Sequence, residues 1–179
     1  MTYHEDYIAW IHNVVHMPTF HSLNAVDFMK NHSIYSVQAI CLLIYIGHNS
    51  GQSDRISVLL ASASRIAQCL GIHRLGSETP LRILKCDDPD TRSKLLIDRE
   101  VSKRAWWFLV RQDWLQIPFN NTYNIHPSQF DTEMPKNCYE DVSKMGLPTD
   151  IVEQNKDRYS QGSYTFVLNK GVVYQNENS

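Results

Sequence analysis

Apolar residues recur at three- and four-residue intervals over most of the first 115 positions, and this spacing predicts helices. The clearest helix covers residues 53–70, where Ser53 can serve as N-cap and Gly71 suits the left-handed position just past the end. Its predicted buried stripe consists of Ile56, Leu59, Leu60, Ala63, Ile66, Ala67 and Leu70. A second long helix is predicted from residue 91 to residue 115.

Three shorter helices are predicted before these two. Residues 7–16 carry an apolar stripe that Pro18 should end, and a short amphipathic piece covers residues 23–30. The third begins with Ser33 or Ser36 as N-cap and continues through VQAICLLIYIG. Because it is apolar on nearly every side, we expect this helix in the middle of a bundle rather than on its surface.

The helix at residues 91–115 contains two adjacent tryptophans, Trp106 and Trp107, with Trp114 following. Adjacent helical residues point about 100° apart, so both indoles can be buried only if the helix contacts partners on two sides. This favours a central bundle helix. The alternative is that one indole lines a ligand cavity or a docking surface.

The pattern changes after Pro118. Residues 117–160 contain four prolines and many Asn and Asp residues with no sustained period, which predicts an irregular loop or linker. Residues 163–179 fit either a β-hairpin or a frayed helix interrupted by Gly171. The predicted fold is therefore all-α, an irregular helical bundle with a Pro/Asn-rich loop region after the Trp-Trp helix.

Charge and composition restrict the function. The 179 residues include 17 Lys and Arg against 19 Asp and Glu, a net charge of -2, and the longest basic run is the pair Lys103 and Arg104. Nucleic-acid binders usually carry a basic patch, so we expect no autonomous DNA binding. The N-terminus contains Glu5 and Asp6 and lacks the pattern of a secretory signal. The uncharged stretch 31–53 has an apolar part of about ten residues, half of what a bilayer crossing needs. These features predict an intracellular protein outside the membrane.

The cysteines and histidines give little support to metal or nucleophile chemistry. Cys41, Cys69, Cys86 and Cys138 are too far apart for paired zinc knuckles. His12 and His16 could share a helical face, but Asn13 stands where the catalytic zinc pattern needs Glu. A small metal-dependent enzyme is therefore the weaker alternative, and surface histidines are favoured.

Other catalytic patterns are equally poor. Cys69 and His73 are four residues apart, but Gly71 interrupts the helical register between them, and we interpret Cys69 as a buried thiol. Walker, GxSxG and GxGxxG patterns are absent from the sequence. The acidic residues at positions 87, 88 and 90 indicate a solvated loop before a helix N-terminus.

Several strings resemble the regulatory middle homology region of fungal zinc binuclear cluster transcription factors, the fungal-specific transcription factor domain. The matching strings are SVQAICLLIYIG (36–47), AQCLGIHRL (67–75) and REVSKRAWWFLVRQDW (99–114), with weaker matches in WIHNVVHMPTF (10–20) and QFDTEMP (129–135). Their order and spacing agree with the family, and together they cover residues 10–135. We expect residues 1–135 to form a partial regulatory domain and residues 136–179 a loop-rich tail.

The resemblance assigns structural or regulatory weight to a small set of positions. Those positions are Gln38, Leu70, Gly71, His73, Glu100, Arg104, Trp106, Trp107 and Asp113. Glu100 and Arg104 lie four residues apart on the long helix, and we interpret this pair as helix support and a packing anchor. We expect the His73 side chain to cap or hydrogen-bond the preceding turn.

The sequence also departs from the family pattern. Only 15 residues separate strings 10–20 and 36–47, where the family usually has further helices, and Asn-Thr-Tyr at 121–123 replaces its Gly-Arg-Pro. The six-cysteine zinc cluster that binds DNA is missing, so zinc is expected only in that missing module and no cofactor in this chain. We therefore expect a fragment or a shortened product of a longer regulator.

The resemblance implies a nuclear, non-catalytic domain that modulates RNA polymerase II transcription. It would reach DNA only through the missing zinc cluster domain, and protein partners or a small-molecule effector would act on it. The alternative is a stand-alone helical interaction protein that pairs with related regulators.

Overall fold

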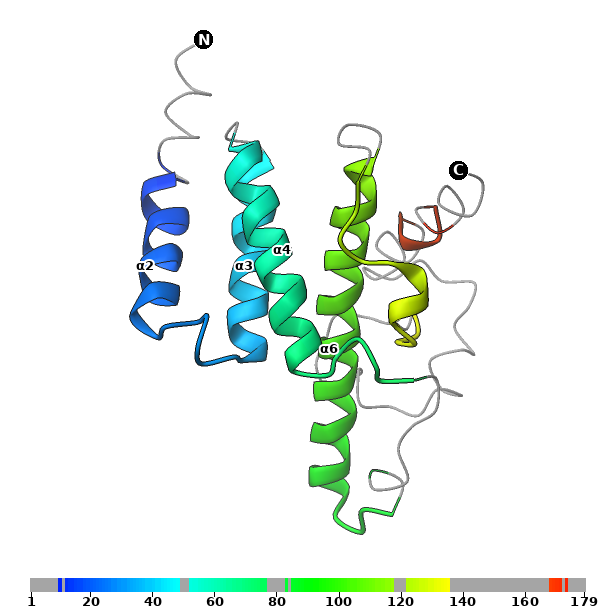
Figure 1. Ribbon diagram of the computed structural model, residues 1–179. Coiled ribbons are helices and arrows are strands. Elements are labelled where there is room, and N and C mark those ends of the chain that lie inside the picture. The colour runs from blue at the N-terminus through cyan, green and yellow to red at the C-terminus, as the bar shows by residue number, and fades with distance from the viewer. Residues whose placement is uncertain are drawn as a thin grey trace. The chain divides into compact units, whose positions relative to one another are not determined.

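All regular elements among the described residues are helical, which confirms the all-α prediction. The computed structural model describes residues 10, 12–48, 52–76, 83, 85–117, 122–135, 168–171 and 173. In chain order the elements are the π-helix η1 (His12–His16), α2 (Met17–Ala25), α3 (Ile34–His48), α4 (Ser53–Cys69), α6 (Pro89–Leu115) and the 3-10 turn η2 (Pro127–Gln129) (Figure 1). The chain divides into two compact units, Met1–Gly71 and Ile72–Ser179.

The first unit is built around α3. This helix packs against α4, α2 and η1, and α3 and α4 run alongside each other in Figure 1. Its buried side chains are Ser36, Val37, Ile40, Leu43 and Ile44. One face is nevertheless exposed, so the expectation that α3 is covered on every side is wrong. No helix in the described part of the chain is long and apolar enough to cross a membrane.

The ends of α3 and α4 follow the sequence only in part. Ser33 precedes α3 and its Oγ accepts the backbone N–H of Ser36 at 3.1 Å, so Ser33 is the N-cap. At α4, Gln52 occupies the N-cap position with no side-chain cap, so the prediction for Ser53 is wrong. Gly71 adopts φ +75° just past the helix, as predicted.

The first helical segment differs more from the prediction. The prediction that Pro18 ends a helix is wrong, because Pro18 lies in the first turn of α2. Backbone N–H groups in a first turn have no intrahelical acceptor, so the missing N–H of proline costs no hydrogen bond there. The helix ends at Ala25, so the predicted piece at 23–30 is wrong over most of its length. The chain reverses there through Asp27, which has φ 49°.

In the second unit α6 begins two residues earlier than predicted. Asp88 is its N-cap and accepts the backbone N–H and the hydroxyl of Thr91, while Pro89 occupies the first helical position. The acidic residues before the helix thus include its cap. The described residues 122–135 are irregular apart from η2, as expected, and 168–171 and 173 are helical. The predicted division at residue 135 stays a prediction.

Candidate functional site

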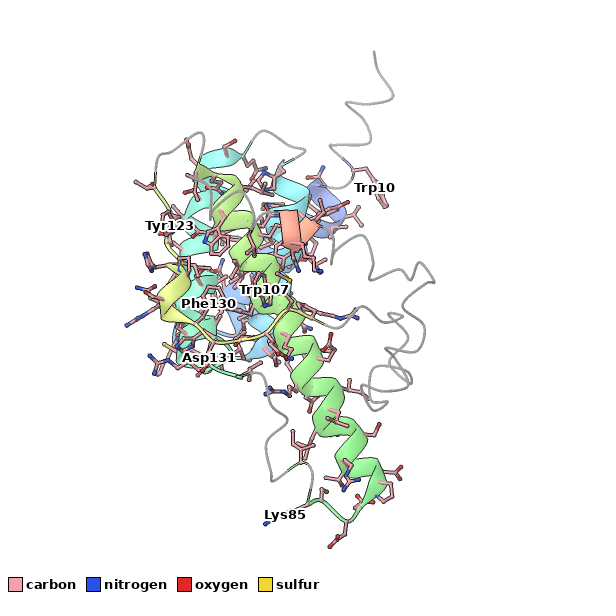
Figure 2. All side chains as sticks on the ribbon, turned by 90° about the vertical axis from the view of Figure 1, so that its right-hand side faces the viewer. Trp10, Lys85, Trp107, Tyr123, Phe130 and Asp131 are labelled. Carbon is pink, nitrogen blue, oxygen red and sulfur yellow. The ribbon has the colours of Figure 1, made fainter. Side chains whose placement is uncertain are left out.

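Phe130 lies among the three tryptophans of α6. Its ring is edge-on to Trp106 (centroids 5.5 Å apart, 69°) and to Trp107 (5.8 Å, 88°), and tilted against Trp114 (6.3 Å, 45°). Figure 2 shows Phe130 on the segment that runs beside α6 at Trp107. Edge-to-face pairs of this kind contribute about 0.5 to 1.5 kcal/mol beyond the burial of their area. We call Phe130 and the three indoles the aromatic cluster.

Two of the three indoles also hydrogen-bond the irregular segment. Trp107 Nε1 donates to the carbonyls of Thr132 (3.0 Å) and Glu133 (2.9 Å). Trp114 Nε1 donates to the carbonyl of Ile125 at 2.8 Å. Trp106 is 1% exposed, and its Nε1 has no hydrogen-bond partner among the described residues. The adjacent indoles therefore have different roles, since only Trp107 holds backbone carbonyls.

Asp113 binds the start of the same segment. Its carboxylate accepts the backbone N–H groups of Asn124 and Ile125, both at 2.7 Å, and the side-chain amide of Asn124 at 2.8 Å. The residue is only 2% exposed, so these donors replace the water that the charge would otherwise bind. Residues 122–135 are thus bound to α6 at both ends.

Thr132 joins this segment to the chain that follows α4. Its hydroxyl donates to the carbonyl of Ile72 (2.8 Å) and accepts the N–H of Leu75 (3.0 Å). Asp131 adds a backbone bond to the carbonyl of His73 at 3.1 Å, and its carboxylate accepts the N–H of Gly76 at 3.0 Å. Residues 72–76 are therefore held beside the aromatic cluster.

The His73 ring packs on Trp106, with centroids 5.9 Å apart and planes at 52°. Burial lowers the pKa of His73, the Arg74 charge lowers it further, and Asp131 partly opposes both. Its Nδ1 is buried with no hydrogen-bond partner in the described part of the chain, so the expected cap of the preceding turn is not made. Gly71 shapes that turn instead, through its positive φ.

Charged side chains on α6 pair within the protein. Arg104 Nε lies 3.4 Å from Glu100 Oε1, and Glu100 is 3% exposed, so the predicted pair forms and is anchored by burial. Lys103 Nζ lies 3.4 Å from Glu133 Oε2. Arg99 donates to the carbonyl of Gly76 at 2.9 Å, and burial lowers its pKa. The basic run of the sequence thus faces acidic partners of the same chain.

The structure brings together four of the nine positions singled out from the sequence. His73, Trp106, Trp107 and Asp113 meet around residues 122–135, and Glu100 and Arg104 lie on the same helix. Gln38, Leu70 and Gly71 belong to the first unit, and Leu70 is 36% exposed rather than buried.

The residues of the irregular segment that contact α6 were not singled out from the sequence, and they are Asn124, Ile125, Phe130, Thr132 and Glu133. The string QFDTEMP (129–135) contains Phe130, Thr132 and Glu133, but nothing in the sequence indicated Asn124 or Ile125, because an irregular segment has no period.

The described residues offer no arrangement for metal chemistry. No three of their His, Cys, Asp or Glu side chains gather closely enough to hold an ion. His12 and His16 lie in a π-helical turn rather than in an α-helix. His16 is 1% exposed, so its interpretation as a surface histidine is wrong. Cys69 is exposed, so its interpretation as a buried thiol is wrong.

The chain is similar to fungal proteins named as transcription factors. It is 33% identical over 110 residues to "Probable transcription factor lepB" of Aspergillus flavus, covering 59% of this chain and 19% of that protein. It is 28% identical over 121 residues to "Agnestins biosynthesis cluster transcription factor AgnL11" of Paecilomyces divaricatus, covering 65% and 17%. With "Pyriculol/pyriculariol biosynthesis cluster transcription factor 1" of Pyricularia oryzae the identity is 27% over 150 residues, covering 82% and 18%.

The chain spans less than a fifth of the length of each of these curated relatives. No model of a known protein family matches the chain. No solved structure matches it either. The similarity supports a role in transcriptional regulation.

Proposed function

We propose that this chain is part of the regulatory middle homology domain of a nuclear fungal transcription factor. It modulates transcription by RNA polymerase II through protein contacts or an effector, is not an enzyme, and does not hold DNA itself. The relatives named as transcription factors support the class. A short part of a longer regulator can act in this way if it folds into a defined surface.

One observation carries the proposal. The strings at 67–75, 99–114 and 129–135 are far apart in the sequence, and residues of all three meet at the aromatic cluster. The hydrogen bond from Trp107 to Thr132 is the central contact of this site, and the His73 ring also contacts the aromatic cluster. If the three strings belong to one folded regulatory domain, their residues should meet in space. Residues of unrelated chance matches would instead lie scattered through the structure.

The charge arrangement supports the absence of DNA binding. Lys103 has a side chain only 6% exposed and pairs with Glu133, and Arg104 pairs with Glu100. Phosphate contacts need basic groups that can reach the DNA backbone. The longest basic run of the chain is therefore engaged within the protein.

A fusion experiment tests the regulatory role. The full chain is joined to a heterologous DNA-binding domain, and reporter transcription is measured in a fungal host against the DNA-binding domain alone. We expect the fusion to change reporter output and Asp113→Asn to abolish the change, because an amide has one acceptor oxygen and an NH2 donor where the buried carboxylate accepts from three donors. Asp98→Asn is the matched control, since Asp98 lies exposed on the same helix.

Two outcomes would contradict the proposal. One is a fusion whose reporter output equals that of the DNA-binding domain alone, with the chain present at normal abundance. The other is tight binding of the purified chain to duplex DNA at physiological salt, measured by fluorescence anisotropy.

A further inference from the structure

We draw no further inference here: the strongest candidate, the two buried ring nitrogens Trp106 Nε1 and His73 Nδ1, which lack hydrogen-bond partners in the described part of the chain, belongs to the site already described, and neighbouring atoms cover both nitrogens so closely that neither borders a space able to hold a ligand or a water molecule.

Discussion

The carboxylate of Asp113 accepts the backbone N–H of Ile125 at 2.7 Å, and Ile125 is completely buried. Because Trp114 Nε1 donates to the carbonyl of the same residue, both backbone polar groups of Ile125 are satisfied by α6. An irregular segment can be buried only when its backbone groups find such partners. Two neighbouring residues of one helix therefore fix where residues 122–135 begin to pack.

Asp113→Asn should lower the free energy of unfolding by about 3 kcal/mol, because an amide offers one acceptor oxygen and a donor where the carboxylate met three donors. Urea unfolding monitored by circular dichroism measures the change. Asp98→Asn, exposed on the same helix, should stay within about 0.5 kcal/mol of wild type. Equal effects in the two variants would refute the role given to the Asp113 carboxylate.

Trp107→Phe should destabilise the chain by about 1 to 2 kcal/mol more than Trp106→Phe. Both changes remove a similar volume from a buried position, but only Trp107 Nε1 donates to carbonyls, those of Thr132 and Glu133. Comparing the two variants by urea unfolding therefore isolates the hydrogen bonds from the loss of packing. If Trp106→Phe proved the more destabilising, Trp107 would not be the indole that binds the segment.

The sequence predicted the helices well where an apolar period was long. The helix at 91–115 was predicted within two residues of its start, and six of the seven stripe residues of α4 are buried. Predictions failed at helix ends, as with Pro18 and Ser53, because proline is compatible with a first turn and a cap needs a geometry that residue type alone does not determine.

The candidate site could be predicted only on its helical side. Two adjacent tryptophans indicated contacts on two sides of α6, but the segment that supplies those contacts has no period and came from elsewhere in the sequence. The contrast between Trp106 and Trp107 also depends on atoms of Thr132 and Glu133, which spacing cannot place. Long-range hydrogen bonds of this kind are set by tertiary packing.

Acidification should destabilise the protein through His73. Burial and Arg74 hold its pKa below the usual value of about 6.5, against the opposing charge of Asp131, so folding favours the neutral ring. The stabilisation is complete above the unfolded pKa and is lost as pH falls below about 6.5 towards the folded pKa.

Urea unfolding at pH 7.5 and pH 5.5 should therefore show a smaller difference in His73→Phe than in wild type. His21→Gln, at an exposed position on α2, is the control and should retain the wild-type difference. An unchanged difference in His73→Phe would show that other groups cause the pH dependence.

Replacing Asp27 by glycine should raise the free energy of unfolding by about 0.5 to 1 kcal/mol. Asp27 has φ 49°, a left-handed conformation that glycine adopts without steric cost. The bonds around it run from the Phe28 N–H to the Leu23 carbonyl (3.2 Å) and from the Asp27 N–H to the Asn24 carbonyl (3.0 Å), so the backbone alone can close the helix end. A urea midpoint below that of wild type would contradict this.

Gly47→Ala should lower the free energy of unfolding by about 1 to 2 kcal/mol although alanine favours helix more than glycine does. A Cβ at this position would lie 2.8 Å from Cγ1 and 2.9 Å from Cδ1 of Ile56, which is 2% exposed and has little room to move. Gly171→Ala is the matched control, because no heavy atom lies within 4 Å of the added Cβ and its residue is helical. That variant should be neutral or slightly stabilising. Thermal and urea unfolding of the two variants side by side measure the difference, and equal stability would mean that α3 and α4 do not approach closely at Gly47.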